Sequence, residues 1–418
     1  MKVLVIGGGG REHAVISKLK ESKRISTIIA MPGNAGISEI ATCVNIGTKE
    51  IDKILEYLEK DPVDLVVVTP DDPLALGLVD ALNERKIRAF GPVARAAEIE
   101  SSKAFAKNLM KKYGIPTGDF EIFDNYEKAL EFLENSKYPI VIKASGLALG
   151  KGVLICNSKQ EAKDTVFDMM KNEVFGKSGH TIIIEEFLQG PEVTVLAFTD
   201  GKTISTMPSS QDHKRVFDGD KGLNTGGMGA FSPSKNYTLD IESYCVENIF
   251  IPTINALAQE GRKFKGVIYF QMMLTQNGPK VIEYNARFGD PETQALMPLL
   301  KTDLLDIFEA IIDERLDDLH IQWEDLASVT VVLASKGYPQ DFVKGYEISG
   351  LDKLDDSSLT LYHMGTKEDK GRIVTNGGRV LSLTAKADTI DQAMKKVYKN
   401  IERVQFKDMH FRKDIGRK

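Results

Sequence analysis

The sequence is poor in cysteine. Its 418 residues include only three, Cys43, Cys156 and Cys245, and their separation fits neither a metal-binding motif nor a disulfide framework. The first residues, MKVLVIGG, enter a strand at once and lack the layout of a signal peptide. No apolar run is long enough to span a bilayer. We therefore expect a cytoplasmic protein with no membrane partner.

The sequence also lacks an excess of positive charge, because 60 acidic residues outnumber 54 basic ones and the formal net charge is −6. Nonspecific binding of nucleic acid needs a basic face, so we expect no nucleic-acid partner. A local lysine cluster can still bind small anions. Hydrophobic content of 42% and charged content of 27% are typical of soluble proteins, and the length allows two to four domains.

Strands and helices alternate over the first hundred residues, which predicts a doubly wound α/β domain with a parallel sheet. The predicted strands are 2–6, 26–30 and 64–68, and the predicted helices are 11–20, 51–60 and 74–85. A helix at 101–113 follows. Strand patterns then dominate, at 140–143, 153–156, 181–185, 192–198, 267–275 and 280–284, with a helix near 160–171.

Two further features complete the expected organisation. Residues 209–235 are polar and glycine-rich, which indicates a long functional loop. From about residue 327 a small α+β unit is expected, with strands at 328–334 and 380–387 and a helix at 390–402. The expected domains are 1–102, 103–325 with a flap subdomain at about 118–190, and 326–418.

A glycine run, IGGGGREH at residues 6–13, joins the first strand to the first helix. The position where a dinucleotide-binding fingerprint needs its third glycine is Glu12, and residues 31–34 offer no ribose-binding acid. A nicotinamide-dependent dehydrogenase is therefore disfavoured. Glycine amides at a helix N-terminus, with Arg11 beside them, can bind an anion. A tight turn that binds nothing gives the same pattern.

The stretch GLALGKG, residues 146–152, lies between two apolar runs. It is not a Walker loop, because its glycines are one residue too close, its last residue is not Ser or Thr, and a strand follows it. A glycine-rich loop between strands is a hairpin flap, which can close over phosphates with backbone N–H groups and Lys151. Lys143, on the incoming strand, can reach the same phosphates. A flexible hairpin with solvated lysines is the alternative.

Residues 182–192, IIIEEFLQGPE, form an apolar strand that runs into Glu185 and Glu186. This pattern is typical of a sheet edge. It is also that of a segment that binds adenine through its backbone, with Glu192 on the ribose hydroxyls. The pattern alone leaves both interpretations open.

The stretch KVIEYNARFGDPETQ, residues 280–294, concentrates polar groups on one strand face. Glu283 and Asn285 point to the same side, and their hard oxygens suit Mg²⁺. Arg287 follows on that side, with a planar fork for a carboxylate or phosphate. A solvated strand end is the alternative, but the apolar opposite face favours a site.

The loop at 209–235 places Asp212, His213, Lys214 and Arg215 in a row. The glycine-rich residues 226–229 then allow a ligand to approach the backbone closely. A histidine such as His213 is more often structural than catalytic, but these neighbours indicate substrate contact.

Together these motifs resemble the ATP-grasp superfamily and, within it, the phosphoribosylamine–glycine ligase family of purine synthesis. The resemblance covers nearly the whole chain, and NTGGMG and NARFGDPETQ are its highly specific motifs. The matching stretches are VIGGGGREHA near the start, PGNAG at 32–36, SKAFAK at 102–107, the flap, QDHKR at 211–215, NTGGMGAFSP at 224–233, NARFGDPETQ at 285–294 and FRKDIG at 411–416.

The resemblance implies that ATP, glycine and 5-phosphoribosylamine give ADP, phosphate and glycinamide ribonucleotide, through a glycyl phosphate. It implies small-molecule partners only, a monomer or weak homo-oligomer, and Mg²⁺ or Mn²⁺ as cofactor. The residues implied are Arg287, Asp212 and Lys214 for catalysis; Lys103, Lys143, Gly150, Lys151, Glu185, Glu186, Leu188 and Glu192 for ATP; Gly9, Gly10, Arg11, Asn34, Asp71, His213, Arg215, Gly227, Asp290, Pro291 and Glu292 for the substrates; and Glu283 and Asn285 for the metal.

Three positions depart from the family pattern. Asp71 stands where the family usually has a glutamate, Ser145 where an aspartate is common, and Gln271 where related ATP-grasp enzymes often place a second metal-binding acid. Two other readings stay open. In the first, the chain is another ATP-grasp ligase that acts on a different ribonucleotide. In the second, it is a nucleotide-binding regulator without turnover, and the presence of Glu283, Asn285, Arg287 and the flap lysines argues against this.

Overall fold

The N-terminal region is a parallel sheet buried on both faces, as predicted. In the computed structural model, which describes residues 1–148, 152–354 and 358–417, its strand order is β3-β2-β1-β4-β5. Alternate residues of β1 enter different hydrophobic clusters, Leu4 in one and Val5 in the other. The strands are β1 (Lys2–Gly7), β2 (Thr27–Pro32), β3 (Thr42–Cys43), β4 (Leu65–Val68) and β5 (Ala89–Phe90), and the helices are α1 (Gly10–Leu19), α2 (Ile51–Lys60), α3 (Asp71–Ala75), α4 (Leu78–Glu84) and α5 (Ala94–Ser101).

One helix of this region differs from the prediction. The single helix expected over residues 74–85 is wrong, because α3 ends at Ala75 and α4 begins at Leu78. Gly77 lies between them with φ at +85°, in the left-handed region that glycine tolerates. The shorter helix α3 begins at Asp71, which lines the cavity described below.

The flap is a four-stranded antiparallel sheet in the order β6-β9-β7-β8. Strands β7 (Ile140–Ala144) and β8 (Val153–Cys156) pair as a hairpin, which confirms the predicted strand–loop–strand pattern. Its other elements are β6 (Phe120–Phe123), β9 (Ile182–Glu186), α7 (Tyr126–Glu134) and α8 (Lys159–Met170). Helix α6 (Lys103–Tyr113) leads into it, and the Ser102 hydroxyl caps this helix by accepting from the Phe105 N–H.

A second antiparallel sheet lies next to the flap, in the order β11-β10-β16-β17. It consists of β10 (Glu192–Thr199), β11 (Ile204–Thr206), β16 (Gly266–Thr275) and β17 (Gly278–Asn285), with α9 (Leu239–Cys245) and α10 (Ile251–Gln259) beside it. Residues of β10 and β16 share one hydrophobic cluster with residues of β1 and β4. This shared core fixes the central sheet against the N-terminal sheet.

The C-terminal sheet contains strands from two distant parts of the chain. The prediction of a long loop at 209–235 is wrong, because this stretch contains four short strands. They are β12 (Gln211–Asp212), β13 (Arg215–Phe217), β14 (Lys221–Asn224) and β15 (Gly229–Ser232). Strands β12 and β15 join β18 (Ala327–Ser335), β22 (Arg379–Ala387), β19 (Leu359–His363) and β23 (Met409–His410) in one sheet. Helix α13 (Ile390–Asn400) packs on β18 and β22 through shared apolar residues.

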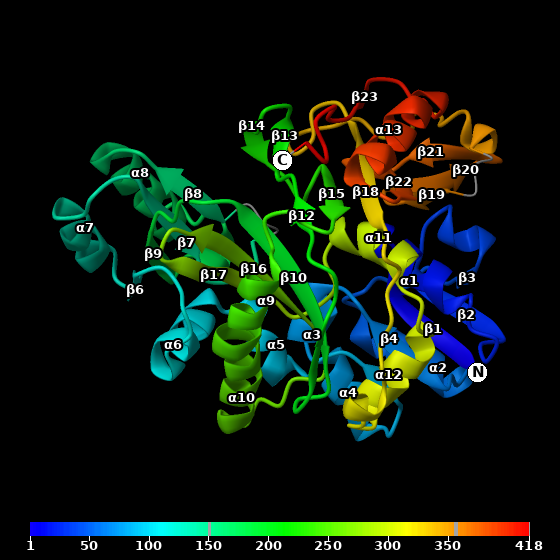
Figure 1. Ribbon diagram of the computed structural model, residues 1–418, viewed down its shortest axis with the longest axis horizontal. Coiled ribbons are helices and arrows are strands. Elements are labelled where there is room, and N and C mark those ends of the chain that lie inside the picture. Colours follow the sequence, from blue (N-terminus) through cyan, green and yellow to red (C-terminus); the bar gives the residue numbers. More distant parts are fainter. Residues whose placement is uncertain (149–151, 355–357, 418) are drawn as a thin grey trace.

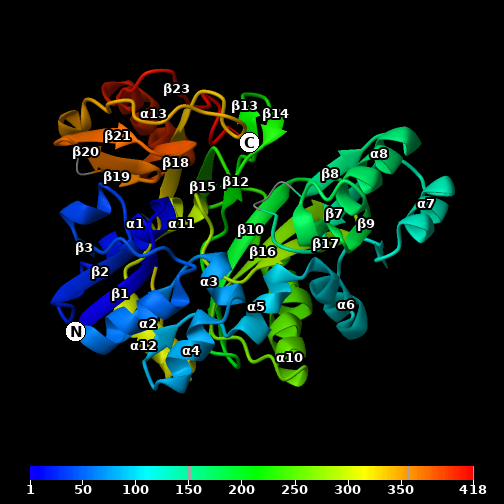
Figure 2. The same cartoon turned by 180° about the vertical axis from the view of Figure 1, so that it is seen from behind.

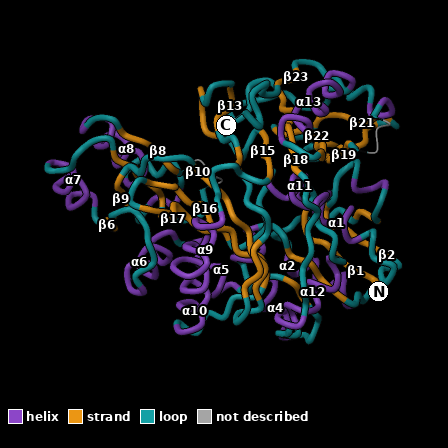
Figure 3. The backbone as a smooth tube through the Cα atoms, in the orientation of Figure 1, coloured by secondary structure: helices purple, strands orange, loops and turns teal. Residues whose placement is uncertain are grey.

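The remaining elements are α11 (Glu292–Leu296), α12 (Leu304–Ile312) and the hairpin of β20 (Thr366–Asp369) and β21 (Arg372–Thr375). Figures 1 and 2 show the flap with α7 and α8 at one end of the molecule and the C-terminal sheet beside the N-terminal sheet at the other. Figure 3 shows the long strands of the central sheet between these parts. In the described ranges, no helix combines the length and apolar character needed to cross a bilayer.

Candidate active site

A cavity of about 990 Å³ lies where the flap, the central sheet and the C-terminal sheet meet. Most of the residues expected at the site line it. These are Arg11, Asp71, Lys103, Lys143, Glu185, Glu186, Leu188, Glu192, Asp212, Lys214, Arg215, Glu283, Asn285, Arg287, Asp290 and Glu292. Gly9, Gly10, Asn34, His213, Gly227 and Pro291 do not line it. Gly150 and Lys151 lie outside the described residues.

The expected metal ligands lie two residues apart near the end of strand β17. Glu283 and Asn285 both face the cavity, as the alternation of the strand requires. Burial raises the pKa of Glu283, but the positive charges of Lys103 and Lys214 outweigh it and hold that pKa at about 2. The Lys103 ammonium is 3.7 Å from the Glu283 carboxylate. A permanently ionised carboxylate beside an amide oxygen is a donor set for a hard cation.

Two buried lysines share one carboxylate beneath the flap. Lys143 Nζ and Lys107 Nζ each lie 3.0 Å from Glu185 Oε2, and all three side chains are buried. Burial lowers the pKa of Lys107 to about 8. Two cations against one anion leave a net positive charge at the cavity wall, which favours an anionic ligand there.

Arg287 is held rigidly at the end of β17. Its guanidinium contacts the Glu100 carboxylate at 2.8 Å and donates to Asn285 Oδ1 at 3.1 Å and to the Phe288 carbonyl at 3.1 Å. Burial raises the pKa of Glu100. Burial also favours the neutral form of Asp71, but Arg287 and Arg11 outweigh it, so the pKa of that carboxyl is lowered. The arginine is thus oriented toward the cavity before any ligand binds.

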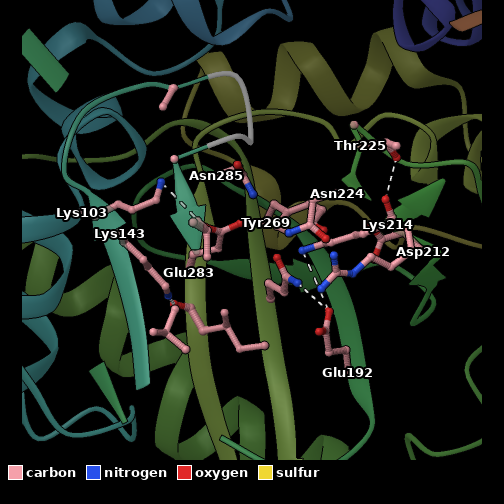
Figure 4. Close-up of a pocket in the computed structure, with 18 of the residues that line it drawn as sticks. Lys103, Lys143, Glu192, Asp212, Lys214, Asn224, Thr225, Tyr269, Glu283 and Asn285 are labelled. Atoms are coloured by element: carbon pink, nitrogen blue, oxygen red, sulfur yellow. Dashed lines mark hydrogen bonds and ion pairs between the residues drawn. The ribbon is translucent and has the colours of Figure 1, made fainter. Parts of the chain in front are cut away.

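Lys214 stands on the opposite side of the cavity. Figure 4 shows Lys103 and Glu283 on one side and Lys214 and Asn224 on the other. The Lys214 ammonium lies 3.9 Å from Glu192, which also accepts a hydrogen bond from Gln271 Nε2 at 2.8 Å. Burial lowers the pKa of Lys214, yet the Asp212 and Glu192 carboxylates outweigh it, and the net shift is upward. The lysine is therefore a cation at every physiological pH.

The polar groups in and around the glycine turn after β1 mainly form hydrogen bonds with other groups of the protein. The Gly9 N–H donates to Glu12 Oε2 at 2.7 Å, and Arg11 Nε donates to Glu12 Oε1 at 2.6 Å. Asn34 donates to the Gly8 and His363 carbonyls at 2.9 Å and accepts from the backbone of the following turn. Of this group only Arg11 faces the cavity, and ligand contact by Gly9, Gly10 and Asn34 stays a prediction.

Arg379 of strand β22 was not singled out from the sequence. It lines the cavity and donates to the Gly226 carbonyl and to the Asp290 carbonyl, both at 2.7 Å. It also lies 3.2 Å from the Asp290 carboxylate. The C-terminal region therefore supplies a charged wall residue that ties two loops together.

Other contributors were also missed. Glu100, Gln211, Asp220, Asn224, Tyr269 and Tyr338 line the cavity, and Lys107 supports it from behind. Glu100 could have been noticed as a carboxylate on the apolar side of the helix at 94–101. Asn224 lies within the NTGGMG motif. Gln211 lies within the QDHKR motif, and the other positions carry no local signal.

The residues present fit a divalent cation. Glu283 is ionised, Asn285 lines the same cavity with its Oδ1 accepting from Arg287, and phosphate and water oxygens are the usual remaining ligands of Mg²⁺. Among the residues that the structure describes, no group of three or more His, Cys, Asp or Glu side chains has metal-binding geometry. The protein alone thus offers a partial coordination shell.

Known proteins match the chain along its length. Three family models match: phosphoribosylglycinamide synthetase N domain at residues 1–100, its ATP-grasp (A) domain at 101–293 and its C domain at 328–418. A phosphoribosylamine–glycine ligase from Caldanaerobacter subterraneus subsp. tengcongensis is 48% identical over 416 residues, covering 100% of this chain and 99% of the relative.

Solved structures agree with this result. The crystal structure of phosphoribosylamine–glycine ligase from Thermotoga maritima has a TM-score of 0.85 and 33% identity, covering 99% of this chain and all of that one. The biotin carboxylase domain of the Hydrogenobacter thermophilus 2-oxoglutarate carboxylase, solved with MgADP and bicarbonate, has a TM-score of 0.76 at 18% identity over 98% of this chain and 91% of that chain, which supports the fold alone. The chain belongs to the phosphoribosylglycinamide synthetase family.

Proposed function

We propose that the chain joins glycine to 5-phosphoribosylamine, converting ATP to ADP and phosphate and giving glycinamide ribonucleotide. Family membership makes it an ADP-forming ligase of purine biosynthesis. The observation that carries the substrate assignment is the shared cavity. Lysines and the Glu283–Asn285 pair line one side of it, and Lys214, Arg215 and Arg379 line the other. A triphosphate and an anionic acceptor can therefore meet within one enclosure.

The reaction proceeds in two displacements. A carboxylate oxygen of glycine attacks the γ-phosphorus, and the bond to the β-phosphate oxygen breaks, so that ADP leaves with the electron pair. The amine of phosphoribosylamine then attacks the carbonyl carbon of glycyl phosphate, inorganic phosphate leaves, and the amine proton is released. Phosphoryl transfer depends on positioned charge more than on covalent help from the protein. This requirement matches a cavity lined by fixed cations.

Each side of the cavity has a role in this scheme. Lys103 and Lys143 hold the nucleotide phosphates, with Lys151 of the flap loop, while the strand end at 185–188 and Glu192 hold adenine and ribose. Arg287 and Lys214 orient the glycine carboxylate, with Asp212 beside them. The acceptor is held by Arg11, Gly9, Gly10, Asn34, Asp71, His213, Arg215, Gly227, Asp290, Pro291 and Glu292.

Glu283 and Asn285 are the proposed ligands of Mg²⁺, for which Mn²⁺ can substitute. When bound, the cation neutralises charge on the β- and γ-phosphates. Neighbouring lysines hold the pKa of Glu283 at about 2, which keeps this ligand ionised at every physiological pH. Gln271 donates to Glu192 and supplies no carboxylate, so phosphate and water would take the remaining coordination positions of the cation.

The wider organisation is also proposed. We assign residues 1–102 to the acceptor domain, 103–325 to the ATP-grasp domain with its flap at about 118–190, and 326–418 to the C-terminal domain. The partners are small molecules only, the protein is a monomer or a weak homo-oligomer, and it acts in the cytoplasm.

One assay tests the proposal. The purified chain is incubated with MgATP, glycine and chemically generated phosphoribosylamine, and ADP and the ribonucleotide product are measured together. We expect one ADP for each product, with ADP release lost when glycine, the amine or Mg²⁺ is omitted. ADP release that ignores glycine would remove the ligase assignment. Turnover only with another ribonucleotide would favour a different ATP-grasp ligase.

A further inference from the structure

The acceptor side of the cavity includes a small hairpin. Strands β13 and β14 pair with each other, and in the described parts of the chain they join no larger sheet. The hairpin and its end nevertheless supply Arg215, Asp220 and Asn224 to the cavity lining. A two-stranded hairpin is marginally stable alone. Within it, Arg215 Nη1 donates to the Gly222 carbonyl at 2.8 Å, so what has to be fixed from outside is the hairpin as a unit.

Arg412 makes the main contacts that hold the hairpin. Its side chain is fully buried and ranks first by size among the fully buried side chains of the described residues. Arg412 Nη1 donates to the Arg215 carbonyl at 3.0 Å and to Asp220 Oδ1 at 2.9 Å. The other edge of the guanidinium donates to both carboxylate oxygens of Asp414 at 2.7 Å. One planar group thus joins the start of β13 to the turn before β14.

Residues next to Arg412, in the segment 409–415, make further contacts with the hairpin. The Gly219 N–H donates to Asp414 Oδ2 at 2.8 Å, and the Lys413 N–H donates to Asp218 Oδ1 at 2.8 Å. The ring of His410 contacts the Val216 carbonyl at 2.8 Å. Every residue of the turn from 218 to 220 is therefore bonded to residues 412–414.

The segment is itself anchored in the C-terminal core. Met409 and His410 pair with β18, and Ile415 is fully buried. The Tyr398 hydroxyl of α13 donates to the Arg412 carbonyl at 2.8 Å and accepts from the Ile415 N–H at 3.0 Å. Figures 1 and 2 both show the chain's C mark beside β13 and β14.

We propose that Arg412 is a positioning residue that fixes the β13–β14 hairpin, and with it Arg215, Asp220 and Asn224, for binding of the acceptor. This rests on the proposed function for the identity of the acceptor, an anionic sugar phosphate carrying an amine. Arg412 does not line the cavity and acts through the hairpin alone. Lysine cannot replace it fully, because an ammonium lacks the planar fork that reaches the hairpin and Asp414 at once.

The test compares two variants with a matched control. Arg412→Lys keeps the charge, and Asp414→Asn weakens the brace of the guanidinium together with the bond that Asp414 Oδ2 accepts from the Gly219 N–H. Arg372→Lys is the control, since Arg372 contacts Glu347 on the exposed surface of the same region. Each protein is checked for a cooperative thermal transition. Hydrogen exchange of residues 215–224 is measured without substrates, and KM for ATP and for phosphoribosylamine is measured separately.

We expect faster exchange at 215–224 in both variants, with other regions unchanged, and a KM for phosphoribosylamine raised about tenfold in Arg412→Lys. The KM for ATP should stay within about twofold, because Lys103 and Lys143 are held by ion pairs with Glu283 and Glu185. Unchanged exchange at 215–224 in folded variants would overturn the proposal. So would equal increases in both KM values. If Arg412→Lys fails to fold, the same readouts on Asp414→Asn decide. If the unmodified protein showed no glycine-dependent turnover, that result would contradict the proposed function instead, whatever the exchange data show.

Discussion

The two sides of the cavity are built differently. The nucleotide wall, which we define as β7, β8, β9 and β17, consists of paired strands whose backbone ladders fix the side chains. The acceptor wall, which we define as residues 211–227 and 290–292, consists of short strands and turns. It is held by arginines from far along the chain, Arg379 and Arg412.

This difference shows two ways of pre-organising a site. A strand presents alternate residues to one face automatically, so Glu283 and Asn285 need little help. A turn has no such ladder, and its carbonyls and carboxylates have to be bonded individually. Changes on the nucleotide wall should therefore affect the chemistry directly, whereas changes to the braces should affect how well the acceptor is held.

The largest expected effect is on the nucleotide wall. Lys143→Met removes one of the two cations paired with Glu185 and one of the proposed phosphate contacts. We expect kcat to fall about 10²- to 10³-fold, the scale of losing one preorganised electrostatic contact. The measurement is ADP release at saturating substrates. Lys163→Met, which removes an ion pair with Glu134 on the flap surface, should leave kcat unchanged. A fall of similar size in the control would contradict the comparison.

An intermediate effect is expected on the acceptor wall. Arg379→Lys keeps a positive charge but cannot reach Gly226 and both Asp290 acceptors together. We expect the KM for phosphoribosylamine to rise about tenfold with a smaller change in kcat. Steady-state kinetics at fixed, saturating MgATP provide the measurement. If kcat fell as far as in Lys143→Met, the two walls would not differ in the way described.

The smallest effect concerns stability rather than turnover. His13 and His363 meet at the contact between the N-terminal sheet and the C-terminal region, where the His363 N–H donates to His13 Nδ1 at 2.8 Å. Burial, and for His13 also the charge of His363, lowers their pKa values from 6.5 to about 3 and about 4. The unfolded chain binds protons first as pH falls, so stability present above pH 6.5 is lost as pH falls from about 6.5 to about 4 for His363 and to about 3 for His13.

Each histidine should contribute at most about 1.4 kcal/mol per pH unit to that slope. The free energy of unfolding is measured by urea titration at several pH values between 7 and 5. His13→Gln should give a shallower slope than the unmodified chain. His320→Gln, at an exposed position, should keep the original slope. Equal slopes in all three proteins would show that the buried pair does not titrate on unfolding.

Sequence patterns predicted the nucleotide wall better than the acceptor wall. The flap hairpin and the shared face of Glu283 and Asn285 follow from local alternation, which the structure confirms. The helix break at Gly77 was missed because apolar spacing continues through it. Arg379 has no distinctive local pattern, and its partner Gly226 lies 153 residues away. Arg412 lies within the FRKDIG stretch, but that stretch does not show its partner Arg215, which lies 197 residues away. Long-range pairing leaves no periodic trace in one sequence.

The distance between the hairpin and its brace has a consequence for synthesis. The ribosome makes Arg215 long before Arg412, which follows 197 residues later. During that interval the nucleotide wall can already assemble from local hairpins, while β13 and β14 wait with Phe217 and Leu223 exposed to solvent, as they still are in the finished fold. A nascent chain that has passed residue 290 thus contains every strand of the nucleotide wall, and neither of the arginines that hold the acceptor wall. The order of synthesis therefore places the strands of one wall before the braces of the other.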